Sequence, residues 1–210
     1  SLKPDLVVGT NVPFHVMLRK PLEMAGVPLY LNMINSYEDV LKSVDDFGRM
    51  AGKEKEAAAK RAQIEKDYAE LTQDVQKGKG PKVLVIFGSP DSFNMSTKLS
   101  FSGDLVKRLG GVNIADKAEN VKDSSFIPLS MEFVAKENPD VVLLITMGGS
   151  KEILEKLRSN MRDNAIWHDV NAVKNNRVYQ LPPSLFTVNP GTHTIDAMKI
   201  MKEYMYGDVK

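Results

Sequence analysis

The sequence predicts an α/β protein made of two lobes that are joined by one long, charged helix. Three observations support this prediction. Two segments, Pro4–Val8 and Pro139–Leu143, each lead from Pro-Asp into a run of Val and Leu. Residues 53–77 contain neither Gly nor Pro and carry six basic and six acidic side chains. After residue 81, short apolar runs alternate with amphipathic segments, which is typical of a mostly parallel sheet with helices on both faces.

The composition is that of a globular protein with a sizeable core. The chain has 210 residues, of which 42% are hydrophobic and 26% are charged. Its 28 Lys and Arg against 27 Asp and Glu leave a net charge of +1, which argues against nucleic acid as a partner. The absence of Cys excludes a disulfide, a thiolate zinc site and a cysteine nucleophile. No apolar run reaches the roughly 18 to 20 residues of a membrane span, and no signal peptide is present in this chain.

The first elements read as a βαβ unit. Residues 6–8 form a strand, 14–25 a helix and 29–33 a second strand. Proline cannot continue a preceding helix, and the Val and Leu run after Pro-Asp is typical of a strand that is buried on both faces. The recurrence of the Pro-Asp pattern favours two similar lobes, although Pro-Asp before a strand is also common in ordinary αβ loops.

Two helices and a linker follow. Ser36 is the expected N-cap of a helix over residues 37–50, which places several apolar residues on one face. Residues 53–77 predict a single long helix with a narrow apolar stripe, and its charges read as a solvated face. Lys77–Pro81, with two Gly and one Pro, is the only clear linker.

The remainder of the chain predicts a second α/β lobe. Its strands are expected over residues 83–87, 112–115, 141–146 and 177–181. Its helices are expected over residues 103–109, 129–137, 150–160 and 194–206. Residues 88–102 are expected to form a Gly-, Ser- and Asn-containing loop.

The motifs of nucleotide-binding and hydrolytic enzymes are missing. Gly88–Asp91 lacks the later Gly and the Lys-Ser/Thr of a P-loop. Phe101–Gly103 lacks the Gly that precedes the serine of a nucleophile elbow. His15, His168 and His193 show no metal-type spacing. No catalytic residue is therefore assigned.

Loops at the carboxyl ends of the predicted strands are the expected ligand site, because open α/β sheets bind ligands there. Their aromatic, thioether and small polar side chains suit a bulky, largely apolar ligand, including one with a soft metal centre. The alternative is that individual Phe and Met residues belong to the core. The predicted ligand-binding residues are Phe14, His15, Phe93, Asn94, Met95, Met147, Gly148 and Phe186.

Several segments together carry a resemblance to a known family. They are Leu2–Val8, Pro81–Val85, Gly103–Lys107 with Gly110–Gly111, Asn138–Val142 and Ala172–Tyr179. The chain resembles the helical-backbone (class III) substrate-binding proteins that supply haem, ferric siderophores or cobalamin to ABC importers. Its second lobe is most similar to staphylococcal-type haem-binding lipoproteins.

The resemblance implies two Rossmann-like lobes joined by a single long backbone helix. It divides the chain into a partial amino-terminal lobe (1–52), an interlobe helix (53–77) and a carboxyl-terminal lobe (78–210). Members of the family have further strands before the point that matches Ser1, so the first lobe is expected to be incomplete in this chain. We expect a monomeric protein that is not an enzyme, needs no intrinsic cofactor and binds no nucleic acid.

The resemblance also implies roles for two residues. Family members dock on their permease through an acidic residue in the helix before the Pro-Asp strand, and Glu132 matches it. Met147 stands where the haem-binding relatives have an axial histidine, so it is a candidate ligand to haem iron. Because the histidine is missing here, ferric siderophores and cobalamin stay alternative ligands. The scarcity of Arg in the loops favours haem among the three.

The expected function is therefore capture of an iron complex and its delivery to an ABC transporter permease. The expected location is outside the cytoplasm, as a periplasmic protein or a membrane-anchored lipoprotein. The alternative function is a cytosolic chelatase or metallocofactor-handling enzyme on the same scaffold. A signal peptide with a lipidated Cys in the native gene would favour the importer.

Overall fold

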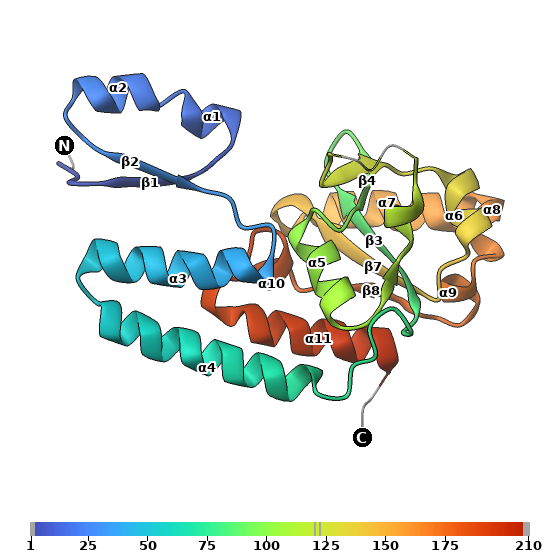
Figure 1. The fold of residues 1–210 in the computed structure, drawn as a ribbon. Helices are drawn as coiled ribbons and strands as arrows, with labels where there is room; N and C mark the ends of the chain where they lie inside the picture. Colours follow the sequence, from blue (N-terminus) through green and yellow to red (C-terminus); the bar gives the residue numbers. More distant parts are fainter. Residues whose placement is uncertain (1–2, 120, 122, 208–210) are drawn as a thin grey trace. The chain divides into compact units, whose positions relative to one another are not determined.

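The computed structural model describes residues 3–119, 121 and 123–207 and shows an α/β chain (Figure 1). Its contacts divide it into two compact units, Ser1–Ile34 and Asn35–Lys210. Both long helices of the first half thus belong to the larger unit. The lobe boundaries predicted at residues 52 and 77 do not coincide with this division and stay a prediction.

The smaller unit is a βαβ unit, as predicted. Its elements are β1 (Val7–Thr10), α1 (Pro13–Val16), α2 (Arg19–Met24) and β2 (Leu29–Asn32), and the two strands pair in parallel. One helix was expected over residues 14–25, but two short helices form. A continuous helix would place Pro21 in its interior, where proline cannot donate and clashes with the preceding turn. In the structure Pro21 lies in the first turn of α2, where it is tolerated.

The strands of this unit are less buried than expected. Among the described residues 3–34, no side chain is fully buried. Leu6 is 37% exposed and Val8 is 49% exposed. The expectation that the first Pro-Asp strand is buried on both faces is therefore wrong for β1 in this structure.

The larger unit begins with a pair of helices, α3 (Tyr37–Ala51) and α4 (Glu54–Thr72). Ser36 caps α3 as predicted, since its Oγ accepts a hydrogen bond of 3.2 Å from the Asp39 amide. Gly52 ends α3 in the left-handed conformation with φ of 63°. A Cβ on Gly48 would overlap the Ala57 side chain, so the two helices are in close contact there. The long helix ends at Thr72, before the predicted residue 77.

A six-stranded sheet forms the centre of the larger unit within the described residues. The strands are β3 (Lys82–Gly88), β4 (Phe93–Ser96), β5 (Val112–Asn113), β6 (Phe126–Pro128), β7 (Val141–Thr146) and β8 (Val178–Gln180). Their order is β6-β4-β3-β7-β8, and β5 pairs with the start of β3. The pairs β3–β5, β3–β7 and β7–β8 are parallel, whereas β4 and β6 run antiparallel to their neighbours. β4 lies within the segment that was expected to be a loop.

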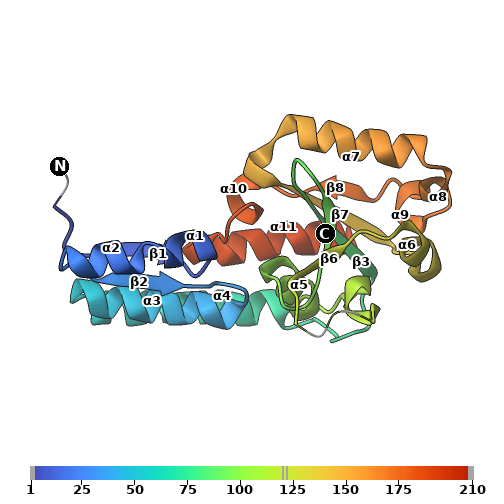
Figure 2. The ribbon, with the colours of Figure 1, turned by 90° about the horizontal axis from the view of Figure 1, so that it is seen from above.

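Helices cover both faces of this sheet. They are α5 (Phe101–Arg108), α6 (Met131–Glu137), α7 (Lys151–Asp163), α8 (Ala165–His168), α9 (Asn171–Lys174), α10 (Pro183–Phe186) and α11 (Thr194–Tyr206). One core cluster packs α3, α4, α5, α10 and α11 against one face. A second cluster packs α6, α7, α8 and α9 against the other. Figure 2 shows α7 on one side of the strands and α5 with α11 on the other. Among the described residues, no helix is both long and apolar enough to cross a membrane.

Candidate ligand-binding site

The carboxyl ends of the central strands form one edge of the sheet in the larger unit. Gly88, the last residue of β3, lies opposite Thr146, the last residue of β7, and opposite Phe93, the first residue of β4. The segments that follow β3, β7 and β8 therefore leave the sheet at the same edge. This is the place where open α/β sheets bind ligands.

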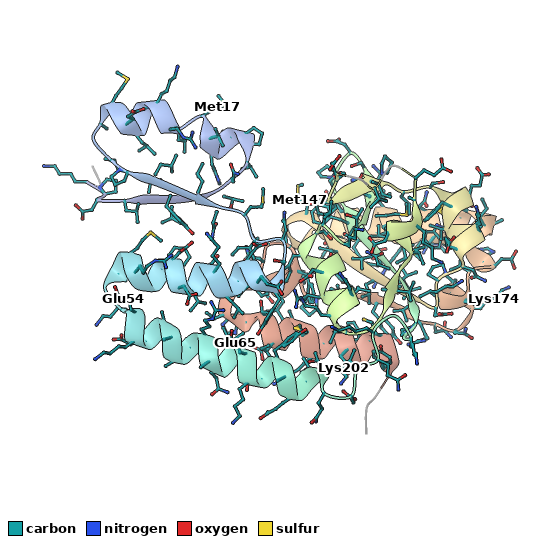
Figure 3. The ribbon with its side chains drawn as sticks, in the orientation of Figure 1. Met17, Glu54, Glu65, Met147, Lys174 and Lys202 are labelled. Carbon is teal, nitrogen blue, oxygen red and sulfur yellow. The ribbon has the colours of Figure 1, made fainter. Side chains whose placement is uncertain are left out.

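Met147 is the predicted iron ligand, and the structure places it at this edge with 47% of its surface exposed. It begins the short 3₁₀ turn Met147–Gly149, in which Gly148 and Gly149 have φ values of 60° and 69°. Only Gly adopts this backbone without strain. Figure 3 labels Met147 where the chain leaves β7.

Neighbouring segments hold this turn in place. The Thr187 hydroxyl donates a hydrogen bond of 3.1 Å to the Thr146 carbonyl. A Cβ on Gly149 would lie 3.0 Å from Cβ of Pro183, so the turn packs closely on the start of α10. Ser150 then caps α7 by accepting a hydrogen bond of 3.3 Å from the Ile153 amide. The Met147 thioether is thus presented from a turn that is fixed on both sides.

The three predicted residues of β4 have different environments. Phe93 and Met95 point to the core cluster under α6–α9, and Met95 is only 2% exposed. Asn94 points to the opposite face and is half-buried, and its amide group donates a hydrogen bond of 2.9 Å to the Ser92 hydroxyl. Met95 is therefore a core residue, whereas Asn94 remains a predicted ligand contact.

Phe186 also belongs to the core. It is 6% exposed and packs with the cluster that contains α5 and α11. Its position at the end of α10 anchors the segment that supports the Met147 turn. We therefore assign Phe186 a supporting role and not a direct contact.

The two predicted residues of the smaller unit lie on α1. Phe14 is 74% exposed, and its ring centroid lies 5.9 Å from that of His15. The Thr10 amide donates a hydrogen bond of 2.9 Å to Nδ1 of His15. A Cβ on Gly9 would lie 3.3 Å from that same Nδ1 and 2.9 Å from Leu31, so Gly9 leaves room for the ring. Both residues remain predicted ligand contacts.

Glu132, the predicted docking residue, is exposed in the first turn of α6. Ser130 caps this helix by accepting a hydrogen bond of 3.3 Å from the Phe133 amide. The Glu132 side chain lies at the surface, and docking through it remains a prediction.

A polar cluster that sequence reasoning missed joins α3, α4 and α5. Arg108 forms ion pairs with Asp104, at 2.7 Å, and with Glu38. Its guanidinium lies 5.0 Å from the ring centroid of Tyr37, which stacks on Tyr68 at 4.4 Å. Burial is the main cause that raises the pKa of Tyr37, to about 12. Burial alone would lower the pKa of Arg108, but its hydrogen bonds to Asp104 and Glu38 raise it overall.

No group of three or more His, Cys, Asp or Glu side chains that could hold a metal ion occurs among the described residues. The edge of the sheet instead offers a thioether, an amide and apolar side chains. Such a set suits a ligand that brings its own metal, since a soft thioether binds iron held in a macrocycle.

The α/β fold and the side chains at the carboxyl edge of its sheet are those of a ligand-binding protein. The chain belongs to the periplasmic binding protein family, which it matches over residues 1–185. The resemblance and the α/β fold predicted from the sequence are thus confirmed.

Individual relatives agree with this membership. The high-affinity heme uptake system protein IsdE of Staphylococcus aureus strain MRSA252 is 30% identical over 217 aligned residues, covering 100% of this chain and 70% of that protein. A solved ABC transporter substrate-binding protein from Listeria monocytogenes EGD-e is 28% identical with a TM-score of 0.83, covering 98% of this chain and 78% of that one. The structure of S. aureus IsdE complexed with heme is 26% identical with a TM-score of 0.83, covering 97% and 78%.

Proposed function

We propose that this protein captures haem or a similar iron complex outside the cytoplasm and delivers it to an ABC permease. The observation that carries the proposal is the half-exposed Met147 thioether, held on a fixed turn at the carboxyl edge of the sheet. Its relatives support the proposal, because they include a heme uptake protein and a structure of that protein with heme. Membrane anchoring as a lipoprotein is part of the same proposal.

The chemistry of the edge favours haem over an anionic siderophore. A thioether is a neutral, soft ligand that binds haem iron. A catecholate or carboxylate siderophore is usually held by Arg side chains. The segments 88–93, 147–150 and 181–187 contain no Arg.

A haem titration followed by Soret absorbance tests this proposal. We expect a stoichiometric, shifted Soret band for the unaltered protein and a changed band for Met147→Ala. Met50→Ala is a matched control, because Met50 is 41% exposed but lies on α3. Absence of any band in the unaltered protein would overturn haem capture. A band that is identical in all three proteins would remove Met147 as the iron ligand.

We also propose that the protein binds its ligand without changing it. Haem extracted after prolonged incubation should then still contain its iron and an intact macrocycle, as judged by mass spectrometry. Loss of iron or opening of the ring would favour the alternative, a chelatase or another enzyme on this scaffold.

Docking through Glu132 is the second part of the proposal. Glu132→Arg should reduce haem transport into cells while leaving haem affinity unchanged, because an exposed charge at a docking surface acts on association with the partner. Glu54→Arg is the control, since Glu54 is also an exposed acidic residue in a first helical turn. Equal loss of transport and of haem affinity in Glu132→Arg would argue against docking.

A further inference from the structure

The two most exposed large apolar side chains in the described part of the larger unit belong to adjoining segments. Val188 keeps 70% of its surface exposed, and Met147 keeps 47%. The Thr187 hydroxyl donates its hydrogen bond to the Thr146 carbonyl, so the residues that directly precede Val188 and Met147 are joined. Both residues therefore lie at the carboxyl edge of the sheet, where the candidate ligand site is. Val188 was not among the predicted ligand contacts.

Hydrogen bonds fix the backbone on either side of Val188. Before it, the Thr187 amide donates a hydrogen bond of 3.1 Å to the Pro183 carbonyl. After it, the Asn189 side chain accepts a hydrogen bond of 3.2 Å from the Gly191 amide. The valine side chain is itself stiff, because its branched Cβ restricts χ1. A ligand that contacts Val188 therefore orders little that is not already ordered, which lowers the entropy cost of binding.

The surface around these two side chains is uncharged. The segments that carry them, residues 147–150 and 181–190, contain no Asp, Glu, Lys, Arg or His. Apolar surface gains free energy when it leaves water, so an exposed valine beside an exposed methionine suits a ligand that covers both. The part of the ligand that lies here is thus its uncharged carbon surface and not its carboxylates.

We propose that Val188 contacts the ring system of a macrocyclic ligand at the carboxyl edge of the sheet. This inference rests on the proposed function and adds a specificity-determining residue to it. Met147 is the proposed ligand to the metal, whereas Val188 contacts the carbon surface of the ring. Val188 should therefore contribute equally to the affinity for haem and for metal-free protoporphyrin.

The test compares Val188→Thr, Val188→Ile and Ile166→Thr. Threonine keeps the branched shape of valine but replaces one methyl with a hydroxyl, whereas isoleucine keeps the apolar surface. Ile166 is the matched control, because it is β-branched, 41% exposed and lies on α8. We expect Val188→Thr to weaken the binding of both haem and metal-free protoporphyrin by roughly four- to twentyfold, since a buried methyl is lost and the new hydroxyl is desolvated without a partner. Val188→Ile and Ile166→Thr should bind both molecules no more weakly than the unaltered protein does.

The Soret band and the pair of ligands separate this role from that of the iron ligand. In Val188→Thr the haem-bound band should keep its wavelength, because the iron ligand is intact. Unchanged affinities in Val188→Thr, or an equal loss in Val188→Ile, would overturn the contact while leaving haem capture standing. An unaltered protein that binds metal-free protoporphyrin but no haem would overturn haem capture alone. Failure to bind either molecule would overturn both.

Discussion

The two strands that follow Pro-Asp have similar sequences but opposite environments. In β7 all six residues are buried, whereas in β1 none of the four is. β7 lies between β3 and β8 in the sheet, while among the described residues β1 pairs only with β2. In both places the run after Pro-Asp forms a strand, but its burial depends on the strands and helices that pack around it.

Truncation of one side chain in each strand is the strongest way to break this comparison. Leu143→Ala in β7 should cost about 2 to 5 kcal/mol of unfolding free energy, because Leu143 is fully buried and its loss leaves a cavity. Val8→Ala in β1 should cost less than about 0.5 kcal/mol, since half of Val8 is exposed. Chemical denaturation measures both. A cost for Val8→Ala as large as that of Leu143→Ala would contradict the difference in burial.

The contact of Arg108 on α5 with Glu38 of α3 and Tyr68 of α4 sharpens the comparison. Arg108→Ala should cost about 1 to 3 kcal/mol, because the Asp104 carboxylate, only 14% exposed, loses its ion pair. Arg158→Ala is the control, since it breaks a pair whose side chains are 52% and 66% exposed and should cost under about 0.5 kcal/mol. Equal unfolding midpoints in urea for the two variants would show that Arg108 does not hold the helices on the sheet.

The smallest expected effect is the pH dependence of the contact between Glu38 and Arg108. Burial would raise the pKa of Glu38, but the hydrogen bond from Arg108 outweighs it and the pKa is lowered. A lowered carboxyl pKa stabilises the fold above the ordinary glutamate pKa, and this stabilisation is lost as the pH falls through the lowered value. The contribution should stay below about 1 kcal/mol, because the Glu38 side chain is 65% exposed.

Measuring Glu38→Gln against the unaltered protein from pH 7 down to pH 3 checks this expectation. The difference in unfolding free energy should shrink towards the acid end. A difference that grows with acidity would have the wrong sign for a lowered pKa.

Much of the larger unit could be predicted from the sequence, because its elements carry strong local signals. The helix over residues 194–206 and the strand over residues 141–146 have the predicted bounds. Ser36 caps α3 as its position before an amphipathic run indicates. β4 and β6 could not be predicted, because they are short, contain polar residues or Pro, and are specified by pairing with strands distant in the chain.

The strength of the local signal also explains which of the predicted site residues could be located from the sequence. Met147 follows a strong strand signal, so its position at the carboxyl edge was predictable. Met95 could not be assigned to the core before β4 was known, because alternate residues of a strand point to opposite faces.

The close contact between Gly48 and Ala57 has a consequence for the order of folding. These residues are near one another in the chain, and the pair α3–α4 can form after closing only a short loop. The pairing of β3 with β7 instead joins residues 58 positions apart, as between Val83 and Val141. Because short loops close with a smaller entropy loss, we expect the helix pair to assemble early and the central sheet to set the overall folding rate.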